Sequence, residues 1–161
     1  MTKVYPFFKG HVFNNWHASS FVVDETTYNC GEQWMMAQKA LVFKDMESYD
    51  KIMTSQVPAS MKAYGKRVKN FDEKEWSQKR YGIVRAGLRQ KFLQNSDLLA
   101  VLLGTGDKEI CEASPYDKIW GIGVDARHPD INAPSKWQGQ NLLGKILMNI
   151  REEIRLARQS L

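Results

Sequence analysis

Two charged residues, Glu32 and Lys39, stand in a largely apolar stretch of the sequence, seven positions apart. Seven positions are close to two turns of an α-helix, so in a helix both side chains would project from the same side. An unpaired buried charge is costly, so each needs a partner, a ligand or a route to water. A desolvated lysine is also less basic and can act as a nucleophile. The alternative is that both side chains simply reach solvent.

A second group of polar and aromatic residues follows later in the chain. Two acids, Glu112 and Asp117, precede Trp120, Gly121 and Gly123. Glycine lets a backbone approach a ligand closely, and a tryptophan face lets a base stack. A third glycine and the strand–turn–helix setting of a dinucleotide fingerprint are missing. The alternative is a packed turn with Trp120 in the core.

Three shorter segments are candidates for holding sugar or phosphate. Gly139 and Asn141 open the last predicted helix, where free N–H groups would form a phosphate cradle. An ordinary N-cap by Asn141 is the alternative. Residues 65–67, Gly-Lys-Arg, form a basic turn that would hold phosphate or face water. Asn15 lies in a short polar and aromatic loop that a turn alone would also explain.

The cysteines and histidines form no metal-binding or redox motif. Cys30 and Cys111 make no CxxC pair, and the three histidines lack ligand spacing. We therefore predict two reduced thiols, no metal site and no cofactor.

Helices dominate the elements that would position these residues. Apolar residues occur all round residues 32–43, which is the pattern of a buried helix. Further helices are expected over residues 46–53, 58–64 and 96–103, with Gly65 as a C-terminal cap. Short strands are expected near residues 4–8, 21–23, 26–28 and 108–113, and residues 114–138 should be mostly loop.

The two longest predicted helices have clear core faces. One begins at Asp72 as N-cap, with Glu75 three positions later as in a capping box. Its core face consists of four apolar residues whose separations in sequence are multiples of four: Trp76, Val84, Leu88 and Phe92. The other follows Asn141, and its apolar face consists of Leu143, Ile146, Leu147, Ile150 and Ile154. Part of its solvent-facing side would be Arg151, Arg155 and Arg158.

Composition fits one globular domain. The chain has 161 residues, 43% hydrophobic and 25% charged, and we expect residues 1–161 to form a single, predominantly helical α+β domain with a few short strands. The net charge of +5 favours phosphorylated ligands and leaves nucleic acid open, although a basic solvated surface would give the same value. Residues 1–11 contain no apolar run of useful length, and no stretch approaches the length of a spanning helix. We therefore expect no signal peptide and a cytoplasmic protein without membrane contact.

Taken in order, these segments resemble the NADAR (YbiA-like) family. The resemblance covers about residues 10–152. The matching pieces are Asn15 with its neighbours, Tyr28 to Ala40, Gly65-Lys66-Arg67, Trp76, Lys91-Phe92, Glu112 to Gly123 and Gly139 to Arg151. The family usually has Gly-Arg at the basic turn, so either Lys66 or Arg67 would reach phosphate.

The resemblance implies an N-glycosidase that uses no metal. Family members cleave phosphoribosylamino-pyrimidine intermediates of riboflavin synthesis or remove ADP-ribose from guanine. The expected substrate is therefore a small molecule in which a phosphorylated ribose is joined through C1 to a nitrogen. An ADP-ribosylated nucleic acid is a further expected substrate class.

The resemblance also implies roles for the candidate residues. Glu32 would be the catalytic acid or base, and Lys39 an electrostatic or a covalent catalyst. Asp117 would be the second catalytic carboxylate. The expected substrate-binding residues are Asn15, Lys66, Arg67, Glu112, Trp120, Gly121, Gly139 and Asn141. Two other classes stay open: a module that binds ADP-ribose or a nucleotide without cleaving it, and a plain nucleic-acid-binding protein.

Overall fold

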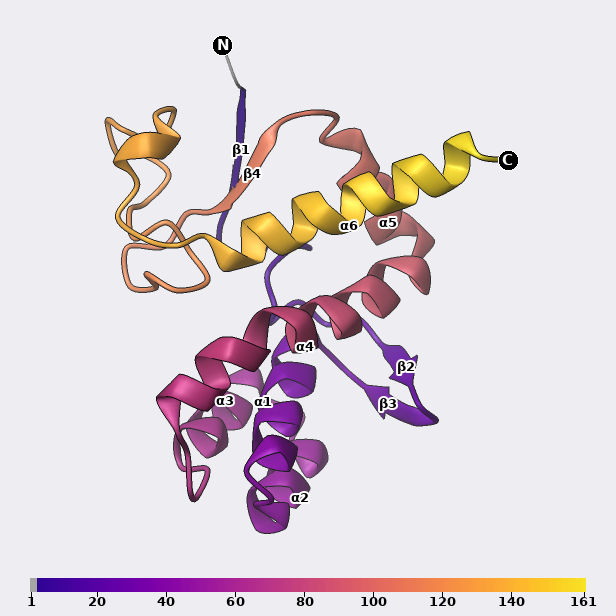
Figure 1. Ribbon diagram of the computed structural model, residues 1–161, viewed down its shortest axis with the longest axis vertical. Helices are drawn as coiled ribbons and strands as arrows, with labels where there is room; N and C mark the ends of the chain where they lie inside the picture. The colour runs from indigo at the N-terminus through magenta and orange to yellow at the C-terminus, as the bar shows by residue number, and fades with distance from the viewer. Residues whose placement is uncertain (1–2) are drawn as a thin grey trace. The chain divides into compact units, whose positions relative to one another are not determined.

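The computed structural model describes residues 3–161, and its chain divides into two compact units (Figure 1). The central unit comprises residues 15–95. The terminal unit comprises residues 3–14 and 96–161. Each unit has its own secondary structure and is described by itself.

The central unit is built around one helix. Its elements are β2 (Phe21–Val23), β3 (Thr26–Tyr28), α1 (Gly31–Val42), α2 (Met46–Thr54), α3 (Pro58–Lys66) and α4 (Glu73–Leu93). Strands β2 and β3 form an antiparallel hairpin. Helix α1 packs against α2, α3 and α4, which explains why its apolar residues occur all round it. The prediction of a buried helix in this segment is confirmed.

Helix α4 begins and packs as its sequence predicts. The carboxylate of Asp72 accepts the backbone N–H of Glu75 at 3.1 Å, so the predicted N-cap is confirmed. The core face at multiples of four is buried along its whole length, at Trp76, Val84, Leu88 and Phe92. Arg80 occupies the remaining position of this row and is also buried.

The prediction that Gly65 caps α3 is wrong. The helix continues through Lys66, and Arg67 is its C-cap residue. A Cβ atom on Gly65 would collide with the Sδ atom of Met36. Gly65 therefore makes room for the Met36 side chain between α1 and α3, and it does not mark a turn of the chain.

The terminal unit joins a parallel pair of strands to two helices. Its elements are β1 (Val4–Phe7), α5 (Ser96–Gly104), β4 (Glu109–Glu112), the 3₁₀ turn η1 (Pro134–Lys136) and α6 (Leu142–Gln159). Strand β1 pairs in parallel with β4, and α6 packs against both β4 and α5 (Figure 1). The predicted apolar face of α6 is buried at all five positions. Parallel pairing is possible because a long crossover separates the two strands.

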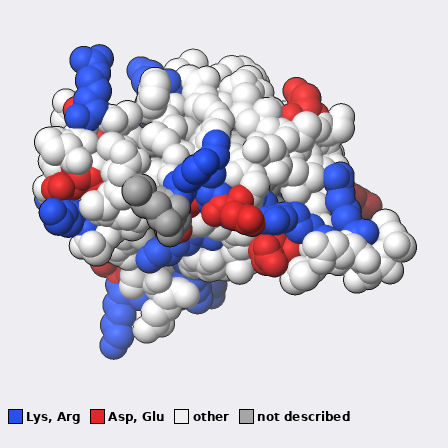
Figure 2. All heavy atoms as spheres, turned by 90° about the horizontal axis from the view of Figure 1, so that it is seen from above, with Lys and Arg blue, Asp and Glu red and all other residues white. Residues whose placement is uncertain are grey.

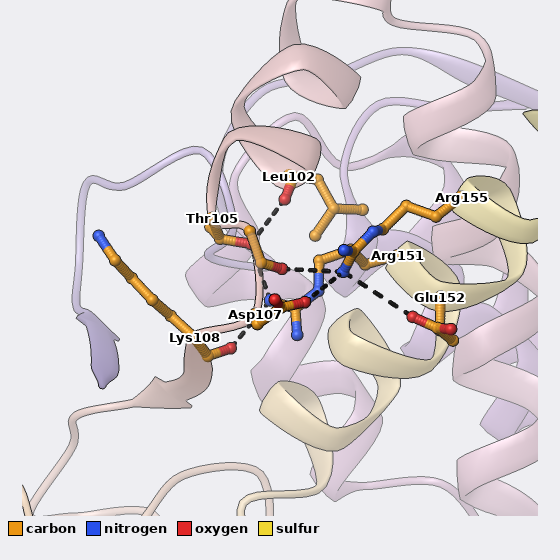
Figure 3. A network of polar contacts seen from close by, with 8 residues as sticks. Leu102, Thr105, Asp107, Lys108, Arg151, Glu152 and Arg155 are labelled. Carbon is orange, nitrogen blue, oxygen red and sulfur yellow. Dashed lines mark hydrogen bonds and ion pairs between the residues drawn. The ribbon is translucent and has the colours of Figure 1, made fainter. Parts of the chain in front are cut away.

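One arginine of α6 does not face solvent, and this part of the prediction is wrong. Arg151 is only 7% exposed. Its Nη1 donates to the Thr105 Oγ1 at 2.9 Å and to the backbone oxygen of Lys108 at 2.8 Å (Figure 3). The neighbouring Arg155 pairs with Asp107 at 2.9 Å. The turn between α5 and β4 therefore supplies two hydrogen-bond acceptors that offset the cost of burying Arg151.

The predicted fold class, a predominantly helical α+β protein with a few short strands, is confirmed. All four predicted strands are formed, and residues 113–141 contain only the turn η1. Within residues 3–161, no helix combines the length and the apolar character that crossing a membrane requires. That the whole chain is one domain stays a prediction.

Candidate active site

The N-terminal turn of α1 holds a buried carboxylate. Cys30 is the N-cap residue, and its sulfur accepts the backbone N–H of Gln33 at 3.4 Å. Glu32 follows in the first turn and is only 5% exposed. Its backbone N–H donates to the backbone oxygen of Asn15 at 2.9 Å. An acidic side chain in this turn is stabilised by the positive end of the helix dipole.

Asn15 brings a polar side chain to the same place. It is 7% exposed, and its Oδ1 lies beside Gly31, where a Cβ atom would approach it to 2.6 Å. Among residues 3–161 this Oδ1 atom has no hydrogen-bond partner. A buried acceptor without a donor is rare and costs about 1–3 kcal/mol. It is therefore a candidate for accepting a ligand hydroxyl next to Glu32.

The second charged residue of the site is Lys39, which lies further along α1 and is half-buried. Its Nζ stands 4.4 Å from the centroid of the Phe71 ring. Burial lowers the pKa of the Lys39 ammonium, and the carboxylates of Glu73 and Glu32 oppose this effect. The predicted loss of basicity is confirmed in direction. Glu32 and Lys39 are thus coupled electrostatically, as their helical spacing indicates.

Of the two residues in the basic turn, Lys66 is the one whose charge acts on Lys39. The positive charge of Lys66 lowers the pKa of Lys39 further, in addition to the effect of burial. Lys66 is the last residue of α3, Arg67 caps the helix, and both are exposed. Lys66 is exposed and Lys39 is half-buried, so the two positive charges together would attract an anionic group of a ligand.

Sequence reasoning missed one residue whose charge acts on Lys39, Glu73, and the arginine that pairs with it, Arg80. Glu73 is the first residue of α4, and its carboxylate is the leading opposite charge acting on Lys39. Arg80, one of the buried residues of α4, donates from Nη1 to the Glu73 Oε1 at 3.2 Å. Its position in the row of core residues was the available signal, because a charged residue there needs a partner.

In the terminal unit, Asp117 organises the loop that carries Trp120. Its Oδ1 accepts the backbone N–H groups of Ile119 at 2.9 Å and Trp120 at 2.8 Å. Asp117 and Trp120 are both half-buried. Trp120 is therefore not fully buried, as the alternative that places it in the core would require.

The glycines of this unit serve close packing between loops. A Cβ atom on Gly121 would come within 2.8 Å of the Asp117 carbonyl oxygen and 3.0 Å of that of Glu112. A Cβ atom on Gly139 would collide with the carbonyl of Gly121. Both glycines therefore let backbone segments meet, and this accounts for them without a ligand.

The phosphate cradle predicted at the start of α6 is not formed. The N–H groups that should be free are donated to carbonyl oxygens of the preceding loop at 2.8–3.1 Å. The four donor–acceptor pairs are Gln140 to Lys118, Asn141 to Gly121, Leu142 to Ile119 and Leu143 to Trp120. These donors are already used, so this helix start does not provide them to phosphate.

Asn141 is also not an ordinary N-cap. It has a left-handed backbone, with φ +53°, and its side chain makes no cap hydrogen bond. Instead its Nδ2 donates to the backbone oxygen of Ile110 at 2.9 Å, and its Oδ1 accepts the N–H of Glu112 at 3.2 Å. Asn141 therefore fixes the end of β4, where Glu112 stands.

The candidate residues thus fall into two sets. Asn15, Glu32, Lys39 and Lys66 gather along α1 in the central unit, with Arg67 next to Lys66. The terminal unit holds Glu112, Asp117, Trp120, Gly121, Gly139 and Asn141 around the start of α6. Within residues 3–161, no three His, Cys, Asp or Glu side chains are grouped so that they would hold a metal ion.

Three proteins of known name are similar to this chain in sequence. N-glycosidase R617 from Acanthamoeba polyphaga mimivirus is 45% identical and covers 94% of this chain and 97% of its own length. N-glycosidase YbiA from Escherichia coli is 30% identical over 88% of this chain and 80% of its own. Riboflavin biosynthesis protein VVA0006 from Vibrio vulnificus is 32% identical over 87% of this chain and 34% of its own.

A solved structure supports the same relationship. The NMR structure of the Escherichia coli protein YbiA matches with a TM-score of 0.81 at 26% identity, over 100% of this chain and 90% of that one. The family model described as the NADAR domain matches residues 7–155, which takes in both units. The chain therefore belongs to the NADAR domain family.

Proposed function

We propose that this chain hydrolyses the bond between a nitrogen base and the C1 atom of a phosphorylated ribose. The chain is a hydrolase acting on N-glycosyl compounds, in line with the relatives named N-glycosidases. The observation that carries the proposal is the coupling of Glu32 and Lys39 on α1. A buried carboxylate and an amine of lowered basicity share one side of that helix.

Cleavage of a C–N glycosidic bond needs two kinds of assistance. Positive charge develops on the sugar, and negative charge develops on the leaving nitrogen. Glu32 stabilises the sugar cation as a carboxylate or moves a proton to the base or from water. Asp117 is the proposed second carboxylate. The overall balance is simple: water adds its hydroxyl to C1, and the base leaves with a proton.

Lys39 has two proposed routes. In the electrostatic route its ammonium orients a ribose hydroxyl or keeps Glu32 ionised. In the covalent route its neutral amine attacks C1 of the opened sugar, the base leaves with a proton, and an imine forms. Water then hydrolyses the imine, which releases the phosphorylated sugar, either ribose phosphate or ADP-ribose, and regenerates the amine. Burial favours the covalent route, because it increases the neutral fraction.

The proposed substrate contacts follow from chemistry and family resemblance. Lys66 and Arg67 hold phosphate, and the buried Oδ1 of Asn15 accepts a sugar hydroxyl. Trp120 stacks on the base, and Glu112 supports that region. Gly121, Gly139 and Asn141 are proposed to shape this part of the site through their backbone packing and the bridge to β4.

Two classes of base fit the proposal. One is the phosphoribosylamino-pyrimidine of riboflavin synthesis, for which the likeness to VVA0006 is support. The other is guanine carrying ADP-ribose, either as a nucleoside or within a nucleic-acid strand. On the face shown in Figure 2, basic side chains are interspersed with acidic ones and form no continuous patch.

The test is release of free base from a panel containing ADP-ribosyl-guanosine, ADP-ribosylated oligonucleotide, riboflavin intermediates and NAD. We expect one substrate class to be cleaved, and Glu32→Gln and Lys39→Ala each to abolish the release. The matched controls are Glu47→Gln and Lys51→Ala, which break an exposed pair on α2 and should retain activity. Full turnover by both site variants would remove the assignment, and tight binding without any product would favour a binding module.

Borohydride separates the two routes for Lys39. When it is added during turnover, the covalent route predicts that Lys39 gains the mass of the reduced sugar phosphate, as read by peptide mass spectrometry. If active enzyme gives no adduct, the electrostatic route holds.

A further inference from the structure

We propose that Phe71 is a positioning residue, whose ring holds the Lys39 ammonium by a cation–π contact and leaves the N–H donors of that amine for the substrate. The use of those donors rests on the proposed function, whereas the contact itself belongs to the free protein. Phe71 directly precedes the N-cap of α4. It adds this segment to a site whose other members in the central unit lie in the Asn15 loop, on α1 and at the end of α3.

The ring is the direct partner of the Lys39 amine. Its Nζ atom stands 4.4 Å from the centroid of the Phe71 ring, inside the limit of about 6 Å for such contacts. Within residues 3–161 this amine makes no hydrogen bond and no ion pair. A lysine side chain has four rotatable carbons, so without a partner its charged end would move among many positions. The ring is therefore the group that limits where the ammonium lies.

Phe71 is itself held from both sides. Its ring meets that of Phe43 edge to face, with centroids 5.3 Å apart, and Phe43 is buried. The preceding residue, Asn70, has a left-handed backbone with φ +60°. The following residue, Asp72, accepts the backbone N–H of Glu75 at 3.1 Å as the N-cap of α4. The ring thus has a defined place from which it holds a flexible side chain.

An aromatic ring suits an amine that has to act on a ligand. A carboxylate partner would accept one or two N–H groups of the ammonium in directed bonds, and those donors would then be withheld from a substrate. A ring attracts the cation through the negative charge on its face and uses no N–H in a directed bond of this kind. Phe71 therefore positions Lys39 while its amine stays available.

Other charges act on Lys39 from three helices. Burial and Lys66 of α3 lower the pKa of the ammonium, whereas Glu73 of α4 and Glu32 of α1 raise it. The ring acts in the same direction as the two carboxylates, because it stabilises the charged form of the amine. Weakening the ring while these charges stay in place should therefore leave more of Lys39 as neutral amine at a given pH.

The experiment changes the charge distribution of the ring and keeps its shape. Phe71 is replaced, through a suppressed stop codon, by phenylalanine with one, three or five ring fluorines, which withdraw negative charge from the ring face in steps. Each protein is treated with limiting acetic anhydride over a pH series, and acetylation of Lys39 is quantified by peptide mass spectrometry. The amine reacts only when it is neutral, and the plateau at high pH measures its accessibility. Lys51, an exposed lysine of α2, is the internal reference.

We expect labelling of Lys39 below its midpoint to rise with each step, to about two- to fivefold above wild type in the pentafluorinated protein. The plateau at high pH and the labelling of Lys51 should not change. Pentafluorination of Phe8, an exposed ring of the terminal unit, is the matched control and should label Lys39 like wild type. Labelling that stays constant across the series at Phe71 would overturn the proposal. Because labelling needs no substrate, it stays decisive even if no member of the base-release panel is cleaved.

Two ordinary substitutions test whether the reaction uses this contact. Phe71→Tyr keeps an aromatic face, and Phe71→Leu keeps an apolar side chain without one. With a cleaved substrate, Phe71→Leu should lower kcat/KM and move the limb of its pH profile that Lys39 sets to lower pH, while Phe71→Tyr should behave like wild type. A loss of activity in Phe71→Leu with an unmoved pH profile would indicate a structural role and overturn the positioning role.

Discussion

The side-chain Oδ1 of Asn141 accepts the backbone N–H of Glu112 at 3.2 Å. The same amide donates from Nδ2 to the backbone oxygen of Ile110 at 2.9 Å, so it pairs with β4 as another strand would. This bridge joins the residue that precedes α6 to the strand that α6 packs on. The last residue of β4, a candidate site residue, is thereby held by a side chain 29 positions away.

Asn141→Ala should destabilise the protein by about 2–4 kcal/mol. The change leaves a buried carbonyl of Ile110 without its donor, and it places alanine in a left-handed backbone conformation. The measurement is the free energy of unfolding in urea. Asn141→Gly separates the two causes, because glycine adopts φ +53° without strain. It should still be destabilised, by about 1 kcal/mol less than the alanine variant, and wild-type stability in Asn141→Gly would contradict the bridge.

Gly144→Ala and Gly82→Ala should change stability in opposite directions. A Cβ atom on Gly144 would collide with the backbone oxygen of Ile110, so we expect a loss of about 1–3 kcal/mol as α6 is pushed from β4. Gly82 lies exposed within α4 with nothing within 4 Å of the added atom, so alanine there should stabilise by about 0.5–1 kcal/mol. Thermal and urea unfolding of the two variants measure whether Gly144→Ala lowers the free energy of unfolding and Gly82→Ala raises it. A neutral Gly144→Ala would show that α6 can move away without cost.

Lys91 should make stability depend on pH above neutrality. Burial lowers its pKa from 10.5 to about 8 in the folded protein. Between about pH 8 and 10.5 the unfolded chain therefore holds a proton that the folded chain has lost, so this residue makes stability rise with pH in that window. The thiols of Cys30 and Cys111 act the opposite way, since burial raises the pKa of each.

The contribution of Lys91 is isolated by comparison with Lys91→Met. The free energy of unfolding of the wild type minus that of the variant should increase as pH rises from 8 to 10.5. The difference removes the effect of groups that do not interact with Lys91, such as the Cys111 thiol. The Cys30 thiol is not removed, because its charge and that of Lys91 act on each other. A difference that stays flat across this window would show that the amine does not titrate there.

Asp117 combines a structural and a proposed catalytic use, and two substitutions separate them. Asp117→Asn keeps an Oδ1 acceptor for the N–H groups of Ile119 and Trp120 but removes the charge. Asp117→Ala removes both. If the carboxylate acts in the reaction, base release should fall by at least about 10²-fold in both variants, while stability falls only in Asp117→Ala. Near wild-type turnover by Asp117→Asn would limit the residue to organising its loop.

Features that depend on neighbours in the chain could be predicted from the sequence. The Asp72 cap, the core row of α4 and the shared side of Glu32 and Lys39 arise from helical spacing and from bonds three or four positions long. The same holds for the strands and for the apolar face of α6. Local geometry determines these features, so they need no knowledge of the rest of the fold.

Only the tertiary structure decided how the polar groups are partnered. Arg151 is buried because its partner Lys108, 43 positions away, offers a carbonyl, and Asn141 bridges to a strand rather than capping its helix. Arg80 sits in an apolar row because Glu73 accompanies it. A periodic pattern tells which side of a helix is buried, but a buried polar atom is satisfied by whichever donor or acceptor the fold brings to it. Those partners are distant in sequence. At the start of α6 they are loop carbonyl oxygens, which accept the N–H groups that were expected to bind phosphate.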